Sequence, residues 1–266
     1  MKISHESITP EVSVENTFVA RDDNRSIIGV CTVSPRDMSA LFPDTPRQFV
    51  IHAKGDERAL HVLYGAAVAR ARVLTERSRA RSRIYAEVSV GDEASLSVLE
   101  ALGFTGGDGV MRMYRRVGGQ MNISRMPESC TIVRDFLADP LERKFFLERY
   151  NACYGLKNND EWLSEITEQP DFARILMVSP SDLCGELLVW SENGVGVIGI
   201  IQTAKKWRRK GVATYLLEDA RLYFNSLGLK FSQFDVWLKA PGALRLAQNC
   251  GYSGGDPLYL YPELRV

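Results

Sequence analysis

Segments with the hydrophobic pattern of strands alternate along this chain with segments that have the pattern of helices. In the C-terminal half, residues 194–203 and 231–238 are predicted to be strands. Hydrophobic side chains dominate the first segment and alternate with polar ones in the second. A helix is predicted between them, opened by Gly211 and stopped by Gly228. Strands and helices in alternation are typical of an α/β or α+β fold.

The same pattern continues over the rest of the chain. Further strands are expected at residues 17–21, 47–52, 82–90, 130–134, 173–178 and 186–190. Helices are expected at 92–102 and 241–249, and over about twenty residues from Glu57. Two more helices should begin at Asp139 and Asp160, whose side chains suit a helix N-cap.

A short motif occurs twice in the chain. Gly103–Asp108, with the sequence GFTGGD, returns as GYSGGD at Gly251–Asp256, an offset of 148 residues from 103 to 251. Each copy follows a predicted strand and a short helix, and each precedes an aromatic-rich strand. The repeat predicts two tandem lobes, residues 1–118 and 129–266, joined by a glycine-rich and polar segment.

Composition narrows the possible functions. The 266 residues suffice for two domains, and 45% of them are hydrophobic, which is enough for buried cores. The formal net charge is zero, so a nucleic-acid partner is not expected. No leader pattern or long apolar run is present, which predicts a cytoplasmic protein without a membrane partner. The five cysteines lack metal-ligand spacing, so we expect neither disulfides nor a metal.

The basic turn at residues 204–210 has the properties of an anion site. It follows a predicted strand and precedes a helix, whose first backbone N–H groups have no acceptor within the helix. The helix dipole adds about half a positive charge there. Arg208, Arg209 and Lys210 add cations, and Gly211 lets an anion approach a backbone without a Cβ. A phosphate group is the expected ligand.

The spacing Arg208-x-x-Gly211-x-Ala213, after a strand and at a helix start, resembles the pyrophosphate-binding motif of the GNAT superfamily of acyl-CoA N-acyltransferases. The downstream strand 231–238, a short helix and the pair Gly251-Tyr252 resemble a second hallmark of that family. The resemblance implies an α/β (α+β) fold of two tandem GNAT-like lobes. Each lobe would be a mixed, mostly antiparallel sheet flanked by helices.

The resemblance also implies that acetyl-CoA is the cosubstrate. In the family, the strand before the pyrophosphate loop splays from its neighbour, and its freed backbone groups bond the pantetheine arm. The expected coenzyme-binding residues are the strand residues Ile201, Gln202 and Thr203, the basic residues Arg208, Arg209 and Lys210, and the helix-start residues Gly211, Val212, Ala213 and Thr214.

The first lobe departs from this pattern. If Ala67 and Ala220 are equivalent, Arg58 stands where the second lobe has Gly211. The neighbouring Asp56 and Glu57 would repel a diphosphate. The first lobe also lacks room for the two helices that follow the opening strand of a complete GNAT unit. We therefore expect a truncated N-terminal lobe that is degenerate for coenzyme binding.

Acyl transfer to an alkyl amine needs a base, because an amine with a pKa near 10 is about one part in a thousand neutral at pH 7. All three histidines lie in the first lobe, so carboxylates are the candidates. Asp235 could face the splayed strands, and Glu186 opens a neighbouring strand; either could instead be an ion-pair partner. The family's thiolate-protonating tyrosine is replaced by Ala247. Four other tyrosines could substitute, of which the first two are more typical of a core and the third is the candidate acid: Tyr215, Tyr252, Tyr259 and Tyr261.

Two functions remain open from the sequence. The first is an N-acetyltransferase that transfers an acetyl group to the primary amine of a small molecule or peptide, by direct attack in a ternary complex. The second is a non-catalytic acyl-CoA-binding regulatory or scaffold protein. A third, more distant possibility is nucleotide binding at the same basic turn. The protein is expected to be a monomer or a homodimer.

Overall fold

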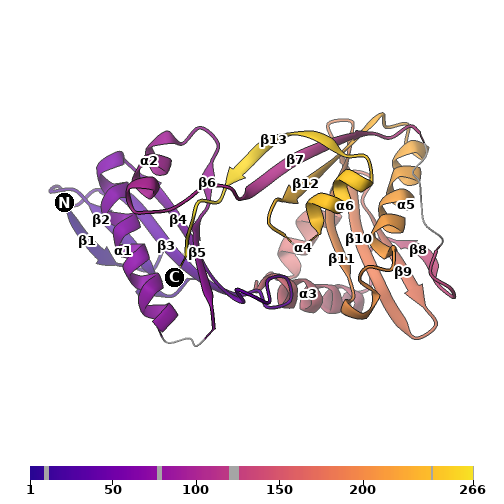
Figure 1. The fold of residues 1–266 in the computed structure, drawn as a ribbon, viewed down its shortest axis with the longest axis horizontal. Helices are drawn as coiled ribbons and strands as arrows, with labels where there is room; N and C mark the ends of the chain where they lie inside the picture. The colour runs from indigo at the N-terminus through magenta and orange to yellow at the C-terminus, as the bar shows by residue number, and fades with distance from the viewer. Residues whose placement is uncertain (9–11, 77–79, 120–125, 241, 266) are drawn as a thin grey trace. The chain divides into compact units, whose positions relative to one another are not determined.

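The computed structural model describes residues 1–8, 12–76, 80–119, 126–240 and 242–265. The chain divides into two compact units, drawn in Figure 1. Unit 1 comprises Met1–Val110, Ala152–Leu156 and Pro257–Val266, and unit 2 comprises Met111–Asn151 and Lys157–Asp256. Each unit has its own hydrophobic core.

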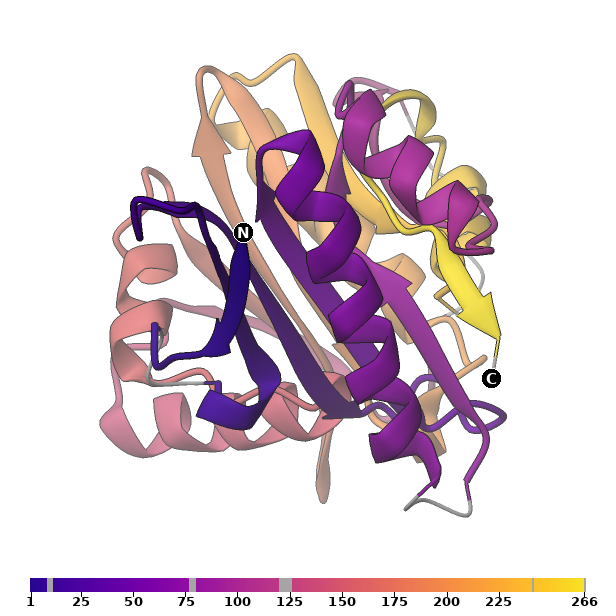
Figure 2. The same ribbon diagram turned by 90° about the vertical axis from the view of Figure 1, so that its left-hand side faces the viewer.

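Unit 1 is built on a six-stranded sheet in the order β1-β2-β3-β4-β5-β14. Only β4 and β5 run parallel; the other neighbouring pairs are antiparallel. Figure 2 shows α1 crossing the sheet with α2 beside it, and both helices contribute to the core. The strands are β1 (Lys2–His5), β2 (Thr17–Arg21), β3 (Ile27–Asp37), β4 (Arg47–Gly55), β5 (Ser82–Ala86) and β14 (Glu263–Arg265); the helices are the 3-10 turn η1 (Val14–Asn16), α1 (Glu57–Glu76) and α2 (Glu93–Ala101).

Unit 2 is built on a larger, eight-stranded sheet in the order β6-β13-β7-β12-β11-β10-β9-β8. The short strand β6 at its end belongs to unit 1. The strands are β6 (Val88–Ser89), β7 (Gly109–Arg116), β8 (Thr131–Asp135), β9 (Ala173–Ser179), β10 (Asp182–Glu192), β11 (Val195–Thr203), β12 (Phe231–Trp237) and β13 (Ser253–Leu260). The helices are α3 (Pro140–Tyr154), α4 (Asp160–Thr167), the 3-10 turn η2 (Lys205–Trp207), α5 (Val212–Ser226) and α6 (Ala243–Asn249).

The predicted α/β fold with two mostly antiparallel sheets flanked by helices is confirmed. Every predicted strand has a counterpart, although the segment 82–90 divides into β5 and β6. The sequence pattern missed β3, a long strand that continues to Asp37. Residue 241, where a helix was expected to begin, lies outside the described residues, and α6 begins at Ala243. No described helix combines the length and the hydropathy needed to span a bilayer.

The two repeats exchange strands. β7 follows the first copy of the repeated motif, but it lies between β12 and β13 in the sheet of unit 2. β14 follows the second copy and pairs with β5 in unit 1. Strands β7 and β13 lie side by side and carry the chain from one unit to the other (Figure 1). The units therefore differ from the consecutive ranges 1–118 and 129–266 at the ends of both repeats, and also at Ala152–Leu156, which belongs to unit 1.

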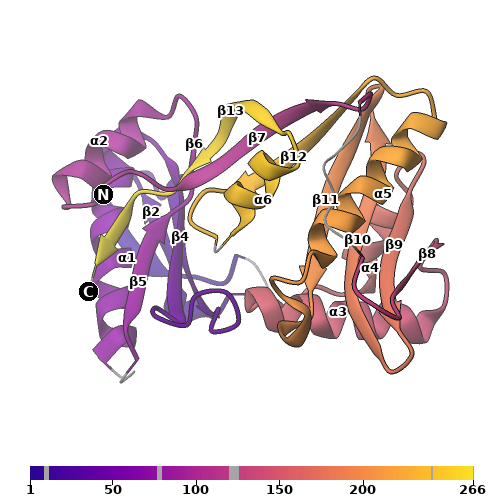
Figure 3. The same cartoon turned by 45° about the vertical axis from the view of Figure 1, so that its right-hand side comes forward.

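The sheet of unit 2 has helices on both faces (Figure 3). Leu187 and Val189 of β10 belong to the core under α5 and α6, whereas Leu188 and Trp190 pack with residues of α3 and α4. This division follows from the strand geometry, in which successive side chains point to opposite faces. A Cβ at Gly185 would lie 2.8 Å from Val212 Cγ1, so the glycine lets α5 approach β10 closely.

A β-bulge interrupts the pairing of β10 with β11. Leu188 pairs with Ile200 and Val189 pairs with Ile198, so that Gly199 has no opposite residue. Bulges bend a strand and increase its twist. A Cβ at Gly199 would overlap the ring of Trp190, which explains why this position is a glycine. The bulge occurs where β11 stops pairing with β12, since their parallel pairing ends at Ile198 and Phe234.

Gly199→Ala should destabilise unit 2, because the added methyl group overlaps the ring of Trp190. Overpacking of this kind typically costs about 1–3 kcal/mol. Gly65→Ala is the matched control: a Cβ at this α1 position meets nothing within 4 Å. It should stabilise its helix by about 0.5–1 kcal/mol. Urea unfolding midpoints should therefore move in opposite directions, and a Gly199→Ala midpoint at or above that of the wild type would contradict the account.

Candidate functional site

The connection between β11 and α5 leaves a helix N-terminus without a side-chain cap. Gly211 occupies the N-cap position in the left-handed conformation, with φ 84°, and no side chain bonds to the cap. The first helical bond runs from Tyr215 N–H to the Gly211 carbonyl, at 3.0 Å. The N–H groups of Val212, Ala213 and Thr214 therefore point out of the helix, as expected for a first turn.

Several contacts hold the basic turn in place. Ala204 N–H donates to the Cys184 carbonyl at 3.0 Å, and Trp207 N–H donates to Ala204 at 2.8 Å. Arg208 Nε donates to the Thr203 carbonyl at 3.3 Å. Lys210 Nζ lies 4.8 Å from the centre of the Trp207 ring, in a cation–π contact. The cations are thus gathered beside the start of α5 by local interactions.

The end of β11 has one unpaired edge. On one side it pairs with β10 as far as Gly185 and Thr203. On the other side, pairing with β12 ends at Ile198 and Phe234, and no described residue continues it. Backbone groups on the free edge of this stretch can bond an extended ligand. Ile201, Gln202 and Thr203, predicted to bind the coenzyme, all lie in the stretch; their role stays a prediction.

The corresponding helix of unit 1 begins differently. Asp56 Oδ1 accepts a hydrogen bond from Ala59 N–H at 2.7 Å, so a carboxylate of the chain already caps α1. β4 pairs with β3 without a bulge from Gly55 to Arg47. Glu87 N–H donates to the Ile51 carbonyl at 3.0 Å and extends the contact between β4 and the segment after β5. That the first lobe is degenerate for coenzyme binding stays a prediction.

The comparisons with known proteins bear on the fold. No protein-family model matches the sequence, and no curated protein matches it significantly. The structure resembles a GCN5-related N-acetyltransferase from Sphaerobacter thermophilus, with a TM-score of 0.53 and 15% identity, over 94% of this chain and 81% of that one. It also resembles a conserved protein of unknown function from Enterococcus faecalis V583, described as a probable N-acyltransferase, with a TM-score of 0.56 and 12% identity, over 92% and 61% of the two chains.

The chain has the GNAT fold. The likeness extends over both repeats, because the matched region covers nearly the whole chain. The two repeats predicted from the repeated motif agree with the division of the chain into two compact units, each with its own core.

Within the GNAT fold, the candidate base Glu186 lies on β10 and is 1% exposed. Both of its carboxylate oxygens accept hydrogen bonds from Arg149, at 2.7 and 2.9 Å. Arg174 Nη1 lies 3.8 Å from Glu186 Oε2. A bidentate pair of this kind is strong and geometrically fixed. Glu186 is thus held in an ion pair with Arg149, the role that the sequence left open beside that of a base.

The second candidate base, Asp235, lies on β12 and is 36% exposed. Its neighbours Phe234 and Val236 are buried in the core under α5 and α6, as the alternating pattern predicted. Asp235 therefore faces the opposite side of the sheet. Arg112 of β7 donates to both of its oxygens, at 2.7 and 2.8 Å. This hydrogen bonding raises the pKa of Arg112.

The candidate acid Tyr259 lies on β13 in unit 1 and is 42% exposed. Ala247, at the position of the family tyrosine, is fully buried in the core of unit 2. Tyr252 is also buried, and its hydroxyl lies 3.0 Å from that of Ser232. Burial raises the pKa of Tyr252 to about 12. Tyr252 is therefore a core residue, and the roles of Asp235, Glu186 and Tyr259 stay predictions.

Two polar side-chain atoms near the predicted coenzyme residues were not found from the sequence. Gln202 Nε2 and Trp207 Nε1 are buried and lack a hydrogen-bond partner. Buried donors of this kind are uncommon in folded proteins. Only the structure could identify them, because a sequence does not show which side-chain atoms are paired.

A second group that the sequence analysis missed lies in unit 1. His52 Nδ1 is 3.8 Å from Glu87 Oε1, and the Tyr261 hydroxyl donates to Glu87 Oε2 at 3.3 Å. The rings of Tyr85 and Tyr261 are 5.2 Å apart. Burial lowers the pKa of His52, while the Glu87 carboxylate opposes this effect and Arg36 adds to it. His52, Glu87 and Tyr261 are distant in sequence, so the sequence pattern does not show that they lie together.

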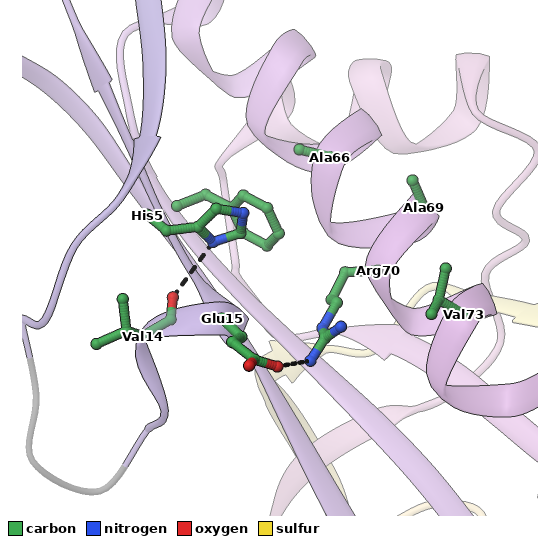
Figure 4. A pocket seen from close by; sticks show the side chains of 8 residues that line it. His5, Val14, Glu15, Ala66, Ala69, Arg70 and Val73 are labelled. Carbon is green, nitrogen blue, oxygen red and sulfur yellow. Dashed lines mark hydrogen bonds and ion pairs between the residues drawn. The ribbon is translucent and has the colours of Figure 1, made fainter. Parts of the chain in front are cut away.

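A pocket of about 560 Å³ lies beside α1 in unit 1 (Figure 4). Its charged groups compensate each other, since Arg70 pairs with Glu15 at 2.8 Å. His5 Nδ1 lies 3.2 Å from the Val14 carbonyl. None of the predicted coenzyme or catalytic residues lines this pocket. Among the described residues, no group of three or more metal-binding side chains is present.

Glu87→Gln should lower the pKa of His52 further, because it removes the carboxylate that attracts the imidazolium. The titration of the His52 ring protons by NMR measures this effect. Tyr261→Phe is the control: it keeps the carboxylate and should not lower the pKa of His52. An unchanged or higher pKa in Glu87→Gln would show that Glu87 does not act on His52.

Because burial lowers the folded-state pKa of His52, the unfolded chain binds this proton more tightly than the folded one. The contribution of His52 to stability is therefore present above the unfolded pKa of about 6.5. It is lost as the pH falls from there through the folded-state pKa. Glu87→Gln should widen this window toward lower pH, which urea unfolding at several pH values measures.

Proposed function

We propose that this protein is an acetyl-CoA-dependent N-acetyltransferase. It transfers an acetyl group to the primary amine of a small molecule or peptide, by direct attack in a ternary complex. The observation that carries the proposal is the uncapped start of α5 at Gly211, beside a basic turn and a strand with one free edge. The GNAT fold supports the same function.

The chain offers separate groups for the two parts of the donor. The N–H groups at the start of α5, with the side chains of Arg208, Arg209 and Lys210, hold the diphosphate. The free edge of β11 at Ile201–Thr203 bonds the amides of the pantetheine arm as an added strand would. α1 cannot hold a diphosphate in the same way, because Asp56 already accepts from its first turn.

The reaction forms a bond between the amine nitrogen and the acyl carbon and breaks the bond from that carbon to sulfur. The amine must lose a proton, which costs about 4 kcal/mol for an amine with a pKa near 10 at pH 7. Asp235 or Glu186 would take this proton, directly or through water. Releasing coenzyme A as the thiolate and not as the thiol costs only about 2 kcal/mol at pH 7, because the pKa of a thiol is near 8.5. Protonation of the thiolate by Tyr259 would therefore help the reaction without being essential.

One specific observation favours the alternative, a non-catalytic acyl-CoA-binding protein. Both candidate bases are held by arginines, Glu186 by Arg149 and Asp235 by Arg112, and Ala247 cannot protonate the thiolate. A protein that had lost catalysis would retain the coenzyme site and lose these functional groups. The two functions make different predictions for turnover.

Gly211→Asp should weaken acetyl-CoA binding by about 2 kcal/mol or more, roughly 30-fold, because it places a carboxylate where the diphosphate binds. Gly211→Asn is the matched control: it has almost the same shape and tolerates the left-handed conformation at least as well. It should weaken binding much less. Isothermal titration calorimetry with acetyl-CoA measures both variants. Equal affinities for the two variants would count against a diphosphate at this turn.

Arg58→Ala in α1 should leave the affinity for acetyl-CoA unchanged, because the donor site is assigned to unit 2. A loss of affinity in this variant would show that the first lobe binds the coenzyme. The same titration with ATP addresses the nucleotide alternative. Binding of ATP as tight as that of acetyl-CoA would show that the pantetheine arm contributes nothing.

Turnover separates the enzyme from the binding protein. Acetyl-CoA is incubated with a panel of primary amines, and the free thiol of coenzyme A is followed with a disulfide reagent. The enzyme should release thiol at a rate that depends on the amine. Tight binding of acetyl-CoA without thiol release for any amine would favour the non-catalytic alternative.

A further inference from the structure

A polar group of side chains lies on the α3/α4 face of the unit 2 sheet, at the free end of β11. Glu186 of β10 and Gln202 of β11 are directly opposite each other in the strand pairing. Residues so placed have Cβ atoms about 5 Å apart. Arg149 of α3 donates to both oxygens of Glu186. Gln202, Glu186 and Arg149 are therefore neighbours.

The face of the sheet follows from the packing of adjacent residues. Leu188 and Ile200 belong to the cluster formed with α3 and α4. Glu186 and Gln202 are two residues away from them along their strands, so they point to the same face. Ile201 points to the other face and packs against the core under α5.

One hydrogen-bond donor of this polar group is buried without an acceptor: Gln202 Nε2. Arg149 uses Nε and Nη2 for Glu186, and its side chain is 36% exposed, so its remaining N–H groups can reach solvent or a ligand. A buried donor without an acceptor is unfavourable, so a ligand oxygen that satisfies it is a natural occupant of the position.

The place of these donors suits an acceptor substrate better than the coenzyme. A pantetheine arm that pairs with the free edge of β11 lies in the plane of the sheet. An amine attacks a thioester roughly perpendicular to the plane of its carbonyl, so where the thioester continues in the plane of the sheet the amine approaches from above or below the sheet. On one side, Ile201, Val212 and Leu216 pack in the core. The amine must then come from the α3/α4 face, where Gln202 lies.

The charges around this polar group favour a neutral oxygen of the acceptor over a carboxylate. Arg149 and the nearby Arg174 are matched by Glu186, and Arg174 also pairs with Asp135 and Glu142. The polar group therefore has no excess positive charge. A carboxylate at this position would lie close to Glu186 and be repelled, whereas a neutral amide carbonyl would accept both hydrogen bonds without that cost.

We propose that the Gln202 side chain, with Arg149, binds an amide carbonyl of the acceptor, so that the acceptor is a peptide-like amine with the carbonyl next to its amino carbon. This inference rests on the proposed function and specifies its acceptor class. Gln202 acts as a positioning residue: it holds the acceptor through the carbonyl while the amine attacks the acetyl group. The nitrogen–carbon bond forms as the carbon–sulfur bond breaks, and the proton lost by the amine nitrogen is returned to the thiolate, so that coenzyme A departs as the thiol.

Three amines of the same size and shape test the proposal: glycinamide, glycine and isobutylamine. They carry an amide, a carboxylate and an isopropyl group, respectively, next to the aminomethyl carbon. With acetyl-CoA, the wild-type protein should acetylate glycinamide with a kcat/KM, expressed per concentration of unprotonated amine, at least about tenfold above the values for the other two. A comparable or higher kcat/KM for glycine or isobutylamine would overturn the proposal.

Gln202→Met removes the donor and keeps the length of the side chain. The ratio of kcat/KM for glycinamide to that for isobutylamine should fall about tenfold or more, mainly through a higher KM for glycinamide. The wild-type protein and the variant are compared on the same two amines, so the difference between the amine pKa values cancels when their ratios are compared. Gln248→Met, at an exposed position of α6, is the control and should keep the wild-type ratio. An unchanged ratio in Gln202→Met would overturn the assignment.

Calorimetry of acetyl-CoA binding to the same proteins distinguishes a wrong acceptor class from a wrong proposed function. If acetyl-CoA binds and none of the three amines is acetylated, the acceptor class is wrong while the coenzyme site stands. If acetyl-CoA does not bind the wild-type protein, the proposed function fails and the inference fails with it.

Discussion

The departure of β11 from β12 is the constraint on which the proposed site depends. Two parallel strands that stayed paired to their ends would have no backbone groups to offer a ligand. The bulge at Gly199 bends β11 after three paired positions, and the ring of Trp190 fills the space that a side chain would need. A packing contact on one face of the sheet thus leaves a hydrogen-bonding edge free in its plane.

The two repeats show how a small local difference separates a candidate ligand site from a structural helix start. In unit 2, eight residues separate β11 from α5, and the cap is Gly211 without a side-chain bond. In unit 1, only Asp56 separates β4 from α1, and its carboxylate bonds Ala59 N–H. An aspartate satisfies a helix N-terminus from within the chain, whereas a glycine leaves the same N–H groups for an outside anion.

Local sequence signals predicted much of this structure. The hydrophobic segment that became β11, the helix opened by Gly211 and the repeated glycine motif depend on neighbouring residues, so periodicity and turn chemistry identified them. The partners of Glu186 and Asp235 could not be predicted in this way. Arg149 lies 37 residues before Glu186, and Arg112 lies 123 residues before Asp235. The bulge at Gly199 likewise depends on Trp190 from another strand.

The exchange of strands between the repeats bears on how the chain is assembled during synthesis. Most of unit 1 is synthesised before unit 2, yet its sheet includes β14, at Glu263–Arg265, which follows unit 2 in the chain and pairs with β5. Unit 2, in turn, receives β7 from the first repeat into the middle of its sheet. Of the two units, the one that is begun first is therefore completed second, and its β5 edge must be kept from other chains until β14 has been synthesised.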